Sequence, residues 1–71
     1  MCVIALKSMT YAIKAKNALN DISLDAQIVT LDPSLTHRGC GYGVRFNCMY
    51  LNEAENALKS RRIKYSEIIN Y

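Results

Sequence analysis

The segment AQIVTLDPSLTHRGCGYGVRFNCM, residues 26–49, contains two strand-like runs with no helical pattern between them. Residues 26–31 form an apolar, β-branched run, and Asp32-Pro33 ends it because proline cannot donate a hydrogen bond within a sheet. Residues 42–49 show the period-two pattern of a strand with one buried face. In this pattern the candidate buried residues Val44, Phe46 and Cys48 alternate with Arg45, Asn47 and Met49. Two adjacent strands at the centre of the chain therefore predict a hairpin.

A strand and a helix are expected on each side of this hairpin. Residues 2–6 form an apolar run typical of a central strand. Ser8 can cap a helix that extends to about residue 22, and its predicted inner face consists of Ala12, Ala15, Leu19 and Ile22. After the hairpin, Asn52 can cap a second helix with acidic residues in its first turn and Lys59, Arg61 and Arg62 in its last, as the helix dipole favours. Residues 65–71, with Ile68 and Ile69, complete the chain as a fourth strand.

The order βαββαβ defines the expected fold. Each βαβ half should cross over with a right hand, so the two halves form one antiparallel four-stranded sheet with both helices on one face. This arrangement is the ferredoxin-like two-layer sandwich, of class α+β. We expect residues 1–71 to form a single domain, because no linker or repeat divides the chain.

Composition limits the classes of function. The apolar runs are far shorter than the roughly 20 residues that span a bilayer, and the first residues lack the basic region of a signal peptide, so we expect a cytoplasmic protein without membrane contact. The formal net charge of +3 favours anionic partners but is small for a nucleic-acid-binding protein. Three cysteines make an odd count, which predicts reduced thiols rather than a disulfide framework.

Cys40, between Gly39 and Gly41, is the candidate reactive residue. In the predicted fold its loop lies at the same end of the sheet as Ser8, which opens the first helix. Backbone N–H groups at that helix end, together with the basic side chains of Lys7, His37, Arg38, Arg61, Arg62 and Lys64, should favour the thiolate. The glycines would leave the sulfur uncovered and allow positive φ angles, so that backbone N–H groups could hold an anion. The candidate binding residues are therefore Gly39, Gly41, Ser8, His37 and Arg38.

Other interpretations of this loop remain open. The two glycines can serve a hairpin turn in which Cys40 is only a small residue, whereas Cys2 and Cys48 are expected to fill strands at the opposite end of the sheet. His37 and Cys40 have the spacing of two zinc ligands, but no further ligands are expected nearby, so we predict no metal and no other cofactor. His37 is expected to face solvent, or to exchange a proton with the thiol.

The segment from residue 38 to 46 also partly matches the RNA-binding strand pattern, although Cys40 replaces a stacking aromatic residue. The first strand offers no aromatic residue as a second base platform. The glycine run is a poor match to a dinucleotide loop, which opens a helix and not a strand. We therefore expect no nucleic-acid partner.

Three features together resemble a family of small domains described as selenium/sulfur (Se/S) carrier protein-like. They are Lys7-Ser8-Met9-Thr10 at the first helix, Leu31-Asp32-Pro33 at the end of the second strand, and Cys40-Gly41 at the start of the third. The resemblance covers nearly the whole chain and implies that Cys40 carries the sulfur or selenium. The sequence departs from the family pattern at residues 37–39, where small hydroxyl residues are common in the family.

The leading hypothesis is a sulfur or selenium carrier that uses Cys40 as persulfide or selenosulfide acceptor, with unidentified donor and acceptor proteins. We expect a carrier or binding protein rather than a turnover enzyme. The alternative is a regulatory or assembly domain that binds a small anion or forms a homodimer through its open sheet face. Residues Arg45, Asn47 and Met49 would line that face, with Tyr42, Tyr50, Tyr65 and Tyr71 contributing aromatic area.

Overall fold

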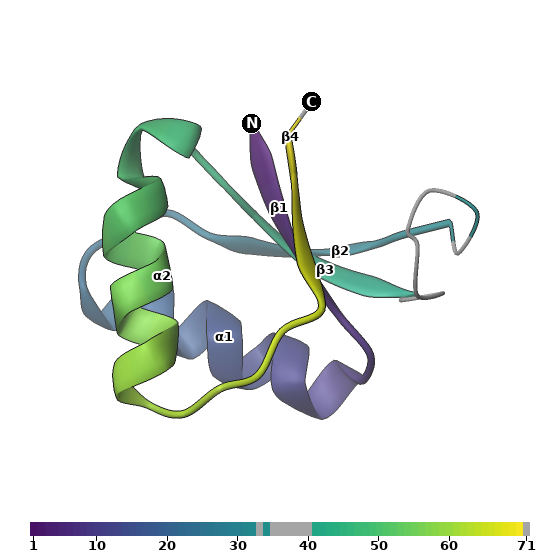
Figure 1. Ribbon diagram of the computed structural model, residues 1–71, viewed down its shortest axis with the longest axis horizontal. Coiled ribbons are helices and arrows are strands. Elements are labelled where there is room, and N and C mark those ends of the chain that lie inside the picture. Colours follow the sequence, from purple (N-terminus) through teal and green to yellow (C-terminus); the bar gives the residue numbers. More distant parts are fainter. Residues whose placement is uncertain (33, 35–40, 71) are drawn as a thin grey trace.

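The chain folds as a sheet covered by helices on one side, as Figure 1 shows for the computed structural model. The structure describes residues 1–32, 34 and 41–70. Its elements, in chain order, are β1 (Cys2–Leu6), α1 (Met9–Asp21), β2 (Gln27–Thr30), β3 (Tyr42–Phe46), the 3₁₀ turn η2 (Cys48–Tyr50), α2 (Leu51–Ser60) and β4 (Glu67–Asn70).

The strand order is β2-β3-β1-β4, and all neighbouring strands are antiparallel. β1 therefore lies inside the sheet, where Cys2 is opposite Phe46 of β3 on one side and Asn70 of β4 on the other. Every residue of β1 is buried, which accounts for its continuous apolar sequence. The order and direction of the strands confirm the predicted ferredoxin-like α+β sandwich.

The main core lies between the sheet and the two helices. The sheet contributes one set of alternating residues, Cys2, Ile4, Leu6, Val44 and Phe46. The helices contribute small residues together with a few leucines, namely Ala12, Ala15, Ala18, Leu19, Ala54 and Leu58. Because alanine extends only a methyl group, α1 can approach the sheet closely. The predicted inner face of α1 is confirmed except at Ile22, which follows the helix and is 44% exposed.

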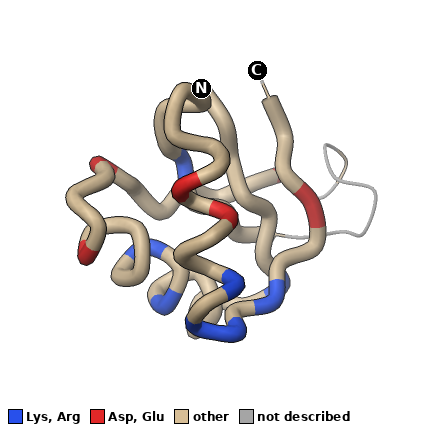
Figure 2. Tube along the Cα trace, turned by 60° about the vertical axis from the view of Figure 1, so that its left-hand side comes forward, with Lys and Arg blue, Asp and Glu red and all other residues tan. Residues whose placement is uncertain are grey.

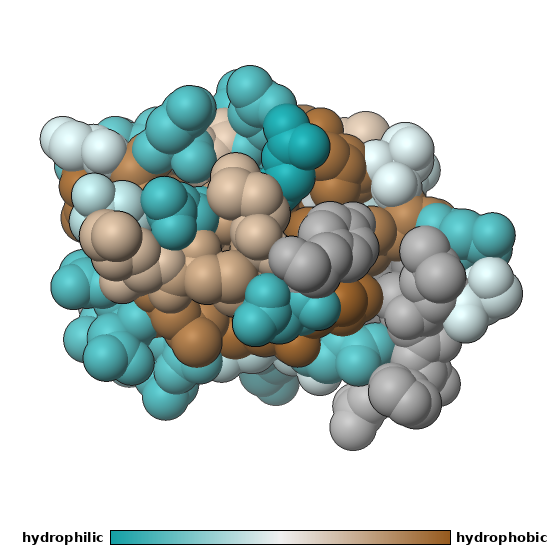
Figure 3. Space-filling model, turned by 90° about the horizontal axis from the view of Figure 1, so that it is seen from above, coloured by the Kyte–Doolittle hydropathy of each residue, from teal (hydrophilic) through white to brown (hydrophobic). Residues whose placement is uncertain are grey.

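The opposite face of the sheet holds a smaller apolar cluster of Val3, Ala5 and Leu31. The side chain of Leu31 reaches this cluster across Gly43, where an added Cβ would lie 2.5 Å from Val3 Cγ1 and 3.0 Å from Leu31 Cδ1. Gly43 is therefore required by packing. Figure 3 views the molecule from above relative to Figure 1, with α1 on the far side, and shows apolar residues across its middle.

The junction between β3 and α2 differs from the sequence prediction. β3 ends at Phe46, and the Asn47 side chain accepts a hydrogen bond from the Met49 N–H at 3.0 Å, which starts η2. Tyr50 caps α2 without a side-chain hydrogen bond, so the predicted cap at Asn52 is wrong. Asn47 and Met49 therefore do not extend β3 along the open face of the sheet as expected.

Both helices end with a left-handed residue that is not glycine. Ser23 has φ 65° after α1, and Arg62 has φ 57° after α2. In each case a later N–H bonds back into the helix, from Leu24 to Leu19 O at 3.0 Å and from Ile63 to Leu58 O at 2.9 Å. This is the Schellman pattern, in which glycine is the common left-handed residue.

Candidate functional site

The candidate site lies at the sheet end where β1 and β2 finish and β3 begins. Tyr42, the first residue of β3, is opposite both Leu6 and Thr30, and the Leu31 N–H donates to Gly41 O at 2.9 Å. Gly41 is therefore held in the sheet framework next to the end of β1. Cys40, Gly39, His37 and Arg38 lie outside the described residues, so the site is defined here by the residues around them.

Ser8 caps α1 at this end of the sheet, as predicted. Its backbone is extended, its Oγ accepts from the Tyr11 N–H at 3.3 Å, and its carbonyl accepts from the Ala12 N–H at 3.0 Å. No acidic residue occupies the first turn of α1. The positive end of the helix dipole is thus not compensated by a carboxylate of its own helix, although the Ser8 hydroxyl is already used as a cap.

Gly41 does not have the left-handed backbone that the sequence suggested. Its φ lies outside the positive range, and an added Cβ would meet no atom within 4 Å. Neither backbone conformation nor packing against the described residues therefore requires glycine at this position. Gly41 differs in this respect from Gly43, two residues further along β3.

The basic residues divide between two places. Lys7 and Lys64 line the same cleft near the start of α1. Arg61 instead forms an ion pair with Asp21 at the end of α1, with Nη2 and Oδ2 2.5 Å apart. Figure 2 shows most Lys and Arg positions in the lower half of that view. Of these cations, Lys7 and Lys64 remain the candidates for supporting a thiolate at this sheet end.

A carboxylate also lies close to the loop. The Ser34 N–H donates to Asp32 Oδ1 at 3.0 Å, directly after the end of β2. This backbone hydrogen bond, helped by one from the Ser34 side chain, holds the pKa of the exposed Asp32 carboxyl below its ordinary value of 3.8. Asp32 is therefore an anion at neutral pH and fixes the first turn beyond β2.

Cys2 and Cys48 form a disulfide, with a Cα–Cα distance of 5.0 Å. The prediction that these cysteines are reduced is therefore wrong. Cys2 points into the main core beside Phe46, and η2 turns Cys48, two residues further on, back towards that core. Asn70 Oδ1 lies 3.5 Å from Cys48 Sγ and could accept a hydrogen bond only from a reduced thiol. Of the three cysteines in the sequence, Cys40 is the one outside this bond.

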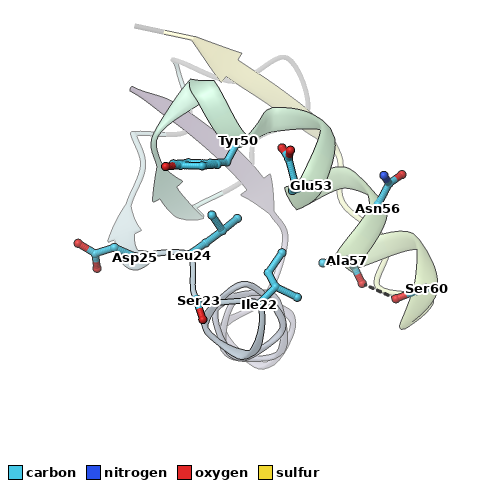
Figure 4. Close-up of a pocket in the computed structure, with 9 residues that line it drawn as sticks. All are labelled: Ile22, Ser23, Leu24, Asp25, Tyr50, Glu53, Asn56, Ala57 and Ser60. Carbon is cyan, nitrogen blue, oxygen red and sulfur yellow. Dashed lines mark hydrogen bonds between the residues drawn. The ribbon is translucent and has the colours of Figure 1, made fainter.

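A larger cleft of about 820 Å³, which the sequence reasoning missed, lies along α2. Figure 4 shows Ile22 and Leu24 on one side of it and Ala57 across from them, with the Tyr50 ring above Leu24. The full lining is Ile22, Ser23, Leu24, Asp25, Tyr50, Glu53, Asn56, Ala57 and Ser60. Neither cysteine nor histidine is among these residues, so the cleft is suited to binding rather than to thiol chemistry. No sequence signal pointed to it, because Ile22 continues the apolar spacing of α1 and its exposure is visible only in the structure.

Metal ligands do not cluster in the part of the chain that the structure describes. No group of three or more His, Cys, Asp or Glu side chains there could hold an ion. Likewise, none of the helices within residues 1–32 and 41–70 is both long and apolar enough to cross a membrane.

A scan against protein-family models gives the class of the protein. The family described as "Putative Se/S carrier protein-like" matches residues 1–70, so the chain belongs to this family. Searches of curated proteins and of solved structures gave no significant match. The resemblance seen in the sequence is thereby confirmed.

Proposed function

We propose that the protein carries sulfur or selenium on the thiol of Cys40 and delivers it to a partner protein. The observation that carries the proposal is the Cys2–Cys48 disulfide, which leaves Cys40 as the thiol of a chain that belongs to an Se/S carrier-like family. A carrier needs one accessible nucleophilic sulfur, and a second or third free thiol would offer competing acceptors.

The transfer needs no cofactor. The Cys40 thiolate attacks the terminal sulfur of a donor persulfide, a new sulfur–sulfur bond forms on Cys40, and the donor leaves as a thiolate. The reaction exchanges one sulfur–sulfur bond for another and is therefore redox-neutral. With a selenium donor the product is a selenosulfide. An acceptor nucleophile then takes the terminal atom and releases Cys40 as a thiolate.

The surroundings of Gly41 support this chemistry. Lys7 follows β1 and the α1 N-terminus begins beside it, both at the sheet end where Gly41 enters β3. Positive charge near a cysteine lowers its pKa from about 8.5 and raises the thiolate fraction. Because Gly41 has room for a side chain but carries none, we assign it the role of keeping the approach to the Cys40 sulfur open.

We place the protein in the cytoplasm, with a donor and an acceptor protein as partners and no turnover reaction of its own. Thiol systems of that compartment keep most disulfides reduced, and of the two cysteines of this bond Cys2 is buried whereas Cys48 is only partly buried. Cys2 is 2% exposed, which limits attack on its sulfur.

A mass measurement tests the carrier function. Wild type, Cys40→Ser and Gly41→Ala are incubated with a low-molecular-weight persulfide donor and analysed as intact proteins. We expect wild type to gain one sulfur atom, Cys40→Ser to gain none, and Gly41→Ala to load more slowly while it remains folded. In parallel, iodoacetamide should label Cys40 at neutral pH faster than an unperturbed thiol. Equal loading of wild type and Cys40→Ser would exclude the proposal.

A second candidate is the assembly domain, favoured by the apolar cluster opposite the helices. Val29 and Ile69 are only partly buried there and lie beside Val3 and Ala5. Arg45 lies on the same face, bonded through Nη2 to Gln27 Oε1 at 3.1 Å. Sedimentation over a range of concentrations tests this candidate: dimerisation that Arg45→Glu abolishes and Cys40→Ser leaves intact would support it, and a monomer at all concentrations would exclude it.

A further inference from the structure

A second cleft, of about 300 Å³, lies at the start of α1 and has an unusual chemical composition. Its five lining residues are Lys7, Tyr11, Lys64, Tyr65 and Ser66. All five side chains end in a hydrogen-bond donor: two ammonium groups, two phenol groups and one hydroxyl. No carboxylate lines the cleft, so the donors meet no fixed anion within it.

The sheet and the helix cap hold the walls of this cleft in place. Ser66 N–H donates to Ala5 O at 2.9 Å, which fixes the segment before β4 against β1. The Ser8 cap fixes the first turn of α1 and with it Tyr11. Lys7 belongs to the short connection between these two supports. The two segments that line the cleft, residues 7–11 and 64–66, are thus held by a backbone hydrogen bond and by the helix cap, and neither of these bonds involves a lysine side chain.

The electrostatics of the cleft favour an anion. Lys7 and Lys64 are exposed and form no ion pair with any carboxylate in the described part of the chain. A third ammonium group, that of Lys14, lies 5.5 Å from the centroid of the Tyr11 ring, although Lys14 itself lines another cleft. Like charges that share one cleft repel each other, and a bound multivalent anion removes this repulsion.

We propose that this cleft binds a tetrahedral oxyanion of the phosphate type, either free or as the charged group of a small ester. Such an anion offers acceptor oxygens in several directions, which suits the two lysines, the two tyrosines and the serine of the cleft. Ammonium groups bind phosphate as point charges, and hydroxyl groups add direction. The cleft is larger than a bare anion needs, so it also has room for a small organic substituent.

The cleft includes Lys7 and Lys64, the two cations that we consider as support for the Cys40 thiolate, but none of its groups is a cysteine, so binding of the anion does not require the thiol. An anion bound there would nevertheless lie at the sheet end where Gly41 enters β3, beside the end of β1.

Titration with inorganic phosphate tests the proposal, with sodium chloride at matched ionic strength as reference. The chain has five tyrosines and no tryptophan, so tyrosine fluorescence follows binding as a whole, and the amide NMR shifts of Tyr11 and Tyr65 show whether it occurs in this cleft. We expect saturable binding, weakened about tenfold by Lys7→Gln or Lys64→Gln and about threefold by Tyr11→Phe. The matched control is Lys59→Gln, which removes an exposed lysine of α2 that does not line the cleft.

Several outcomes would overturn the site. They are binding that does not exceed the chloride reference, an equal loss of affinity for Lys59→Gln and Lys7→Gln, and shifts that avoid Tyr11 and Tyr65. Cys40→Ser should bind phosphate as wild type does, which separates this result from any failure of the carrier function. Tighter binding of glycerol phosphate than of phosphate would identify a small ester as the ligand, and equal affinity would identify the free anion.

Discussion

Reduction of the Cys2–Cys48 disulfide should remove a large part of the stability of this domain. The bond closes a loop of 46 residues, for which the chain-entropy model gives about 13 cal/mol/K, or about 4 kcal/mol at room temperature. A 71-residue domain has a free energy of unfolding of roughly 4–10 kcal/mol in total. We therefore expect reduction to cost about half of the stability.

Urea denaturation followed by circular dichroism measures this difference. The protein is prepared as Cys40→Ser, so that no free thiol can exchange with the disulfide, and is unfolded with and without a phosphine reductant. With a slope near 1 kcal/mol/M for a small protein, the midpoint should fall by roughly 3–4 M on reduction. Thiol titration of unfolded wild type should find one free thiol before reduction and three after it.

Cys48→Ala in the same background is the control, because it contains no disulfide and its midpoint should not respond to the reductant. If the free energies of unfolding of the oxidised and reduced forms differ by less than about 0.5 kcal/mol, the disulfide does not constrain the unfolded chain as argued. Two free thiols in the Cys40→Ser protein before reduction would also refute the reasoning, because they would show that Cys2 and Cys48 are not bonded to each other.

Three further predictions concern single residues. Gly43→Ala should lower the free energy of unfolding in urea by about 1–3 kcal/mol, because its Cβ meets Val3, whereas that of Gly41→Ala should stay within about 0.5 kcal/mol of wild type. Equal losses would contradict the finding that only Gly43 lacks room for a Cβ. Ser23→Gly should raise the free energy of unfolding by about 1 kcal/mol, since the φ of 65° at this position suits glycine. A lower free energy of unfolding would show that the serine side chain is needed. The lowered pKa of Asp32 stabilises its turn above the ordinary value of 3.8, and this contribution is lost as the pH falls through the folded-state pKa. An NMR titration should find the Asp32 pKa closer to 3.8 in Ser34→Ala, and an unchanged value would remove the Ser34 side chain as a cause.

The fold was predictable because each strand and helix carries its own local signal. The apolar run of β1, the Ser8 cap and the end of β2 before Asp32 all agree with the structure. The error at the end of β3 arose because the alternation through Phe46 and Cys48 continues after the backbone has turned. Asn47 can cap a turn as well as Asn52 can, and only the backbone decides which one does.

The disulfide was harder to predict than the fold. Its sequence signal was the placement of Cys2 and Cys48 at one end of the sheet, which the antiparallel pairing of the two strands already implies. Whether the two sulfurs lie close enough for a bond depends on where β3 ends. The odd number of cysteines instead favoured reduced thiols. The candidate site was predictable in part: Ser8 and Gly41 share one end of the sheet, but Arg61 pairs with Asp21 instead of joining them.

The pairing of Cys2 with Asn70 places the first and last strands of the domain, β1 and β4, side by side, as Figure 1 shows. Domains whose first and last segments lie this close tolerate circular permutation and insertion into a loop of another protein. A short glycine linker from Asn70 to Met1, with new ends between His37 and Arg38, would keep all three strand pairs of the sheet. Such a permutant tests whether carrier activity needs an unbroken backbone in the Cys40 loop while the fold stays intact. The domain can also be inserted into a partner protein, because its first and last strands are neighbours.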